Sequence, residues 1–159
     1  MGFGEAIATC LKKYVSFQGR ARRSEYWYFV LFAIVASIPA AILDAIVTPY
    51  QRNGPFSAVL SLALFLPSLS VTVRRLHDID RSGWWVGGLY IYAALAIVVA
   101  IAVLAGNTVA GASAAQSVLL ALLVLGFVGY AILLLVFAIL KGTDGPNRYG
   151  ADPLQSATG

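Results

Sequence analysis

The sequence contains little charge and few of the side chains that enzymes use for catalysis. Asp, Glu, Lys and Arg make up 11% of its 159 residues, whereas a soluble globular domain has about 25%. There are 7 acidic residues, one histidine (His77) and one cysteine (Cys10). A single cysteine excludes a disulfide-stapled secreted domain. The short supply of acidic, His and Cys side chains also leaves few candidates for catalysis or metal binding.

Hydrophobic residues, in contrast, make up 60% of the chain, and the mean hydropathy is +0.82. A globule of this size has too little interior to hide so many apolar side chains from water. A disordered chain is excluded as well, because disorder requires low hydrophobicity and high net charge. The composition therefore predicts that lipid is the solvent of most of the chain.

Four uninterrupted apolar runs are long enough to cross a bilayer, whose core of roughly 30 Å requires about 20 residues of helix. The runs are continuous, which favours helices over the alternating strands of a membrane barrel. The predicted fold is all-α, a four-helix transmembrane bundle that forms one membrane domain over residues 1–159. The predicted spans are 26–47, 56–73, 84–105 and 118–140, and a tail follows at 141–159.

The segment 3–17 has a different pattern. Apolar residues recur at helical spacing from Phe3 onward, and Lys12 and Lys13 occupy another face. This pattern is typical of a short amphipathic helix that lies in the membrane interface with its lysines toward the lipid head groups. Cys10 is interpreted as a member of the apolar face, with palmitoylation as the alternative.

The basic residues predict the orientation of the chain. Ten of the eleven lie before the first span, between the second and third, or after the fourth, and the opposite side has Arg52 alone. Cytoplasmic loops carry the excess of Lys and Arg, so both termini are predicted to be cytoplasmic. Because topology explains the basic residues, nucleic acid is not an expected partner.

Three polar clusters occur at residues 17–27, 74–85 and 142–153, and the predicted topology brings all three to the cytoplasmic face. Their patterns, F-x-G-R-x-x-R-x-E-Y-W, R-R-L-H-D-x-x-R-S-G-W-W and G-x-x-G-x-N-x-Y-G-x-D-P, resemble the small bacterial inner-membrane proteins grouped as domain of unknown function 805. The resemblance covers about residues 10–153. It implies a four-helix, multi-pass protein of the bacterial cytoplasmic membrane, and it implies no established activity.

Spacing within the clusters predicts ion pairs. Arg74 and Asp78 are four residues apart, and Arg22 and Glu25 are three apart, so each pair can meet on one helix face. Turn-forming residues at 144–147 predict that the tail folds back toward the arginines. The candidate ligand or network residues are Arg20, Arg22, Glu25, Arg74, Arg75, His77, Asp78, Arg81, Trp84, Asn147, Tyr149 and Asp152.

Three functions remain open. The leading hypothesis is a structural or interaction protein with a charged network on its cytoplasmic face. The first alternative is binding of an anionic ligand or lipid head group there, because arginines provide forked donors and Trp84 anchors at head-group depth. The second alternative is a small transporter or channel, which would need an oligomer. Asp44, near the outer interface, is expected to pair with Arg52 and not to serve transport.

An enzyme is not expected, because the sequence has no recognised catalytic motif. His77, Asp78 and Asp80 are the densest set of metal-binding side chains, but no second His or Cys accompanies them. No cofactor and no metal are therefore predicted. The predicted partner is the lipid bilayer, and anionic phospholipid, a second copy of the chain and another membrane protein are the further candidates.

Overall fold

A computed structural model describes residues 1–49, 54–106 and 113–154. Within these residues the chain forms five α-helices and no β-strand, and four of the helices are long and apolar enough to cross a membrane. The chain divides into two compact units, which are described separately. One comprises Met1–Ser82 and Leu140–Gly159, and the other comprises Gly83–Ile139.

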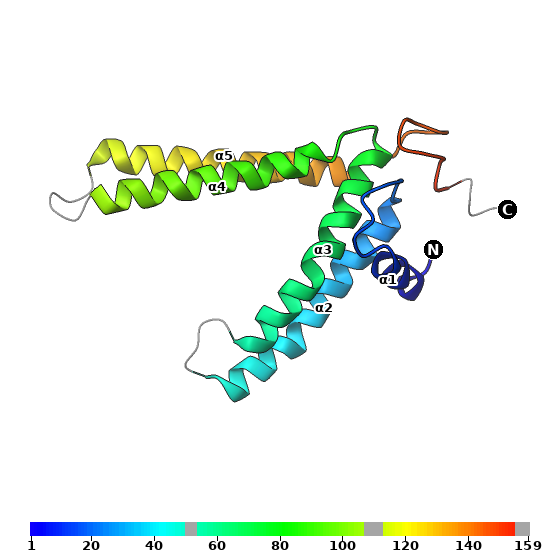
Figure 1. Cartoon of the computed structure of the whole chain (residues 1–159), viewed down its shortest axis with the longest axis horizontal. Helices are drawn as coiled ribbons and strands as arrows, with labels where there is room; N and C mark the ends of the chain where they lie inside the picture. Colours follow the sequence, from blue (N-terminus) through cyan, green and yellow to red (C-terminus); the bar gives the residue numbers. More distant parts are fainter. Residues whose placement is uncertain (50–53, 107–112, 155–159) are drawn as a thin grey trace. The chain divides into compact units, whose positions relative to one another are not determined.

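The first unit is built on a hairpin of two long helices, α2 (Arg23–Val47) and α3 (Pro55–Asp78), which pack side by side (Figure 1). The short helix α1 (Phe3–Lys12) lies against both of them. Its contact face includes Cys10, which is fully buried in a core with Ala21, Phe29 and Val71.

Helix α1 is shorter than the predicted segment 3–17. It ends at Lys12, and the backbone of Lys13 leaves the helical region at φ −95° and ψ 35°. Cys10 packs against protein, with no exposed surface, so its place on the apolar face serves a contact with α2 and α3.

A carboxylate in the last turn of α2 binds the start of α3. Asp44, in the last turn of α2, accepts hydrogen bonds from the backbone N–H groups of Phe56 and Ser57, both at 2.9 Å. These groups belong to the first turn of α3, where helix amides have no partner of their own. Gly54 permits this contact, because a Cβ atom there would overlap the Asp44 carboxyl group. The expected pairing of Asp44 with Arg52 falls outside the described residues.

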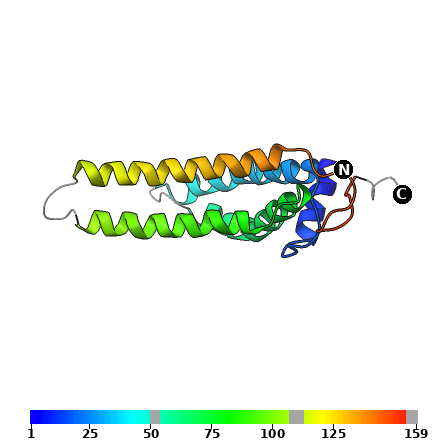
Figure 2. The same cartoon turned by 90° about the horizontal axis from the view of Figure 1, so that it is seen from above.

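The second unit is a hairpin of α4 (Trp84–Gly106) and α5 (Ala114–Ile139), which run side by side in both views (Figures 1 and 2). Two tyrosines connect them. The Tyr92 hydroxyl donates to the Leu123 carbonyl, and the Tyr130 hydroxyl donates to the Trp85 carbonyl, both at 2.9 Å. Lipid provides no hydrophobic drive for helix pairing, so such hydrogen bonds and close packing hold membrane helices together.

Large apolar side chains point outward along the long helices. Leu62 is 74% exposed, Leu95 62% and Leu125 66%. Soluble proteins rarely expose apolar patches of this extent, and 22 to 26 helical residues span more than the roughly 30 Å core of a bilayer. The predicted all-α fold with four membrane-length helices is confirmed. Among the four spans the largest difference is at α3, which continues five residues past the predicted end at Val73.

Gly126→Ala tests the closeness of α4 and α5. A Cβ atom at Gly126 would overlap the Tyr92 hydroxyl, whereas the space around Gly129 on the same helix is open. The variant should lose the Tyr92–Leu123 hydrogen bond, which costs about 0.6 kcal/mol and at most roughly 1.7 kcal/mol in membrane proteins.

The measurement is thermal unfolding of purified protein in detergent. Gly129→Ala, the control, should unfold at the wild-type temperature or slightly above it, because alanine favours helix. Equal unfolding temperatures for the two variants would show that α4 and α5 do not approach closely at Gly126.

Candidate functional site

Five charged side chains lie buried together around the polar end of the α2–α3 hairpin. We call them the ion-pair network; each is less than a tenth exposed. Water-exposed ion pairs contribute little to stability, but buried charges must be paired to be tolerated. The members are Arg20, Glu25, Arg74, Arg75 and Asp78.

Asp78 is the centre of the ion-pair network. Its Oδ1 lies 3.0 Å from Nε of Arg20, and its Oδ2 contacts Nη1 of Arg75. The predicted pair between Arg74 and Asp78 is therefore wrong. Because α3 continues as helix through Asp78, Arg75 at three residues' distance supplies the partner from the same helix, and Arg20 supplies the other from the loop before α2.

Both of these arginines also bind the segment that follows α5. Arg20 donates from Nη1 to the Gly145 carbonyl and from Nη2 to the Thr143 carbonyl, each at 2.6 Å. Arg75 donates from Nη2 to the carbonyl of Leu140. Gly142 lies against the Asp78 carboxyl group so closely that a Cβ atom would overlap it.

Glu25 and Arg74 form the second part of the ion-pair network, across the hairpin. Nη1 of Arg74 contacts Oε1 of Glu25, so the predicted pair between Arg22 and Glu25 is wrong: Glu25 faces α3 and is 3% exposed. The thiol of Cys10 lies 3.8 Å from Oε1 of the same carboxylate. Nε and Nη2 of Arg74 are buried and donate to no protein atom in the described part of the chain.

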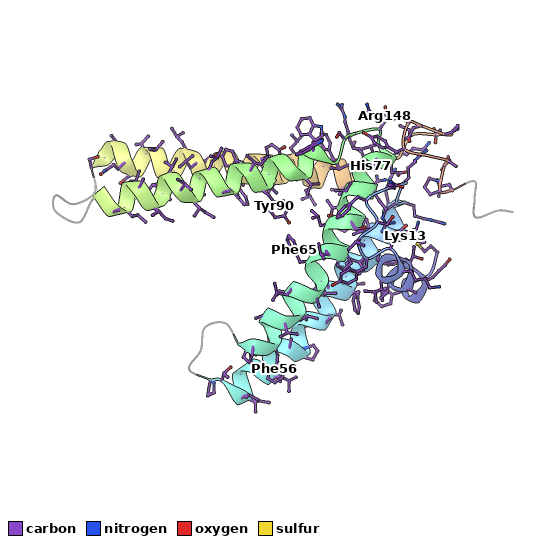
Figure 3. The ribbon with its side chains drawn as sticks, viewed as in Figure 1. Lys13, Phe56, Phe65, His77, Tyr90 and Arg148 are labelled. Carbon is purple, nitrogen blue, oxygen red and sulfur yellow. The ribbon has the colours of Figure 1, made fainter. Side chains whose placement is uncertain are left out.

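The C-terminal segment, defined here as residues 141–154, folds back as predicted. Two of its candidate residues, Asn147 and Tyr149, contact His77, whereas the sequence predicted contacts with arginines. Asn147 donates from Nδ2 to the His77 carbonyl at 2.9 Å. The Tyr149 ring stacks on the His77 ring with centroids 3.8 Å apart and an interplanar angle of 3°. Figure 3 shows His77 and Arg148 close to the end of α3. The contacts tie the C-terminal segment to that end of α3.

Asp152 stabilises the turn of the C-terminal segment itself. Its carboxylate accepts the N–H of Leu154 at 2.8 Å and the N–H of Gly145 at 3.1 Å. The Leu154 hydrogen bond above all, with the one from Gly145 and the positive charges of Arg20 and Lys141, holds the pKa of Asp152 below its usual range. Hydrogen bonds to the ionised form favour it, so Asp152 is a carboxylate at neutral pH.

The remaining candidates lie at the protein surface. Asp80 is exposed and pairs with Arg148 at 3.0 Å, so His77, Asp78 and Asp80 point to three different partners. Among residues 1–49, 54–106 and 113–154 there is no group of three His, Cys, Asp or Glu side chains placed to hold a metal ion. Arg81 is exposed, and Trp84 is 78% exposed and belongs to the second unit.

Sequence reasoning missed three residues that the structure places at the site. Cys10 joins the ion-pair network through Glu25. Gly142 makes room for the Asp78 carboxylate, and the Thr143 N–H donates to the Asp78 carbonyl at 2.8 Å. The signal for the last two was the glycine-rich start of the third polar cluster, which indicates a close backbone approach.

Four membrane-length helices and a buried network of charges at one end of a hairpin define a multi-pass integral membrane protein. Within that class, the chain belongs to the family described as Protein of unknown function (DUF805), which it matches over residues 14–151. The resemblance seen in the three polar clusters is thereby confirmed.

The chain is similar over most of its length to three proteins of Escherichia coli (strain K12). It is 34% identical over 146 residues to Inner membrane protein YhaH, covering 90% of this chain and 91% of the relative. It is 36% identical over 144 residues to Inner membrane protein YhaI, covering 90% of each. It is 30% identical over 140 residues to Uncharacterized protein YiiR, covering 86% of this chain and 85% of the relative. No solved structure matches.

The thiol of Cys10 generates a pH prediction. Burial, and then the nearby Glu25 carboxylate, raise the pKa of Cys10 from 9.0 to about 11. In the unfolded chain the thiol ionises at lower pH, so the folded state loses stability as pH rises from about 9 to about 11 and is unaffected by this group below that window.

Cys10→Ala isolates this effect from the other groups that titrate in alkali. The variant should unfold at a lower temperature at neutral pH, because it leaves a gap in the core. The difference from wild type should then shrink as pH increases. Thermal unfolding in detergent across the alkaline range measures this, and a difference that stays constant would contradict it.

Proposed function

We propose that the protein is a structural or interaction protein of the bacterial inner membrane and not an enzyme. Its ion-pair network holds the C-terminal segment against the end of the α2–α3 hairpin. The excess of Lys and Arg at this end supports a cytoplasmic position for it and for both termini. A partner protein would then meet the C-terminal segment as a folded surface on the cytoplasmic side.

The observation that carries the proposal is that protein oxygen atoms accept from the donors of Arg20 and Arg75. All three nitrogens of Arg20 donate to protein atoms, which are one Asp78 oxygen and the carbonyls of Gly145 and Thr143. Arg75 binds Asp78 and the Leu140 carbonyl in the same manner. Donors that are occupied in this way connect α3 to the segment after α5 and are not free to bind a substrate.

The energetics favour a role in specifying the structure. A buried ion pair often adds little net stability compared with apolar residues of the same volume, but removal of one partner leaves an uncompensated charge. Loss of Asp78 would leave the buried guanidinium groups of Arg20 and Arg75 without their carboxylate partner. The ion-pair network therefore determines where the C-terminal segment docks.

Asp78→Asn tests this structural role. Removal of one partner from a buried ion pair costs about 3–5 kcal/mol, so the variant should unfold at a much lower temperature and accumulate poorly in membranes. Asp80→Asn is the matched control, because its ion pair with Arg148 is exposed and such pairs contribute about 0–1 kcal/mol. Thermal unfolding in detergent and immunoblots of membranes measure both. If Asp78→Asn behaves like Asp80→Asn, the network does not hold the fold.

The proposed orientation has its own test with reporter fusions. Green fluorescent protein fused after Gly159 should fluoresce, and alkaline phosphatase at the same position should be inactive, because the phosphatase needs the oxidising periplasm. Phosphatase fused after Gly106 should be active, since that connection is on the opposite side in the proposed topology. The reverse pattern would place the ion-pair network outside the cytoplasm.

A further inference from the structure

A cavity of about 290 Å³ opens beside the ion-pair network in the first unit. Its wall combines the start of α2 with the C-terminal segment, and its basic residues come from both. Three precede or begin α2, and one follows α5. These basic residues are Arg20, Arg22, Arg23 and Lys141.

The carboxylates of this wall already have partners. Asp78 is bound by Arg20 and Arg75, as described above. Asp152 accepts two backbone N–H groups of the C-terminal segment. Asp144 pairs with Lys141 at 2.8 Å, and both side chains are largely exposed. Because an exposed ion pair of this kind contributes little stability, Lys141 can exchange Asp144 for a ligand of higher negative charge.

Two arginines of the cavity remain available. Neither Arg22 nor Arg23 lies within ion-pair distance of a carboxylate in the part of the chain that the structure describes. Arg22 is half-buried and Arg23 exposed. Consecutive guanidinium groups on one wall concentrate positive charge and provide forked donors that match phosphate oxygens.

The position of the cavity along the chain indicates its depth in the membrane. Arg23 is the first residue of the membrane-length helix α2, and Lys141 comes two residues after α5 ends at Ile139. Residues at the ends of membrane spans lie at the level of the lipid head groups. The available cations are thus placed where phosphate groups of lipids occur.

We propose that this cavity binds a phosphate group through Arg22 and Arg23, with Lys141 as a third cation. The phosphate belongs either to the head group of an anionic phospholipid or to a soluble phosphate ester. The site is distinct from the structural role proposed above, because it uses the cations that the ion-pair network leaves available. Arg20, Arg74 and Arg75, three of the arginines that the sequence suggested for such a ligand, are part of the network.

The test uses the full-length protein, purified in mild detergent, and native mass spectrometry with phosphatidylglycerol. Phosphatidylcholine with the same acyl chains is the reference lipid, because its head group has no net charge. Wild-type protein should retain phosphatidylglycerol preferentially. The double variant Arg22→Gln/Arg23→Gln should bind it at least about tenfold more weakly, because charge-assisted hydrogen bonds are the strong ones.

Arg148→Gln is the control, because Arg148 is exposed, pairs with Asp80 and lies outside the cavity lining. It should retain the lipid as wild type does. Titration with inorganic phosphate, followed by thermal unfolding, separates the two sources of phosphate. Protection of wild type but not of the double variant assigns a soluble phosphate ester, and preferential lipid retention without such protection assigns a head group.

Equal lipid retention by wild type and the double variant, with no protection by phosphate, would overturn the proposal. If the double variant does not fold, the single variants Arg23→Gln and Lys141→Gln decide, because both side chains are exposed. Each should weaken retention or protection. Unchanged binding in both would equally overturn the site.

Discussion

The carboxylate of Asp78 is the feature on which the first unit depends. It is buried, and two guanidinium groups contact its two oxygens. One carboxylate cannot neutralise two cations. The remaining positive charge is stabilised by backbone carbonyls of the segment after α5, which accept hydrogen bonds from the same arginines. Carbonyl dipoles stabilise charge strongly where the local dielectric is low. The loop before α2, the end of α3 and the C-terminal segment are thereby fixed around one charge.

Elsewhere in the protein, too, a few polar contacts connect the helices. Lipid does not drive helices together, so each hairpin is defined by a few hydrogen bonds. Asp44 connects the end of α2 to the start of α3 by accepting from two backbone N–H groups, and Tyr92 on α4 donates to the backbone of α5. A glycine lies opposite each of these side chains, at Gly54 and Gly126, where a Cβ atom would not fit. These polar side chains lie at junctions between helices.

The fold could be predicted from sequence because run length and hydropathy alone determine which segments can span a bilayer. The partners within the site could not. Residue spacing predicted an ion pair between Arg74 and Asp78. Spacing does not determine which side of a helix faces another helix, and Arg74 instead contacts Glu25 across the hairpin. Turn chemistry indicated that the C-terminal segment folds back. That Tyr149 would stack on His77 depends on the path of the backbone, which no local pattern encodes.

Burial divides the arginines of the polar end into two sets that a charge count cannot separate. The positive-inside rule counts every Lys and Arg near the head groups alike, so it does not distinguish these arginines from one another. Arg20, Arg74 and Arg75 are at most 6% exposed and bind protein acceptors. Arg22 is half-buried and Arg23 exposed, and both line the cavity beside Arg20. The structural role and the proposed ligand chemistry thus fall on different residues within one short stretch of sequence. Substitution of Arg22 and Arg23 therefore tests the proposed ligand site and leaves the ion-pair network in place.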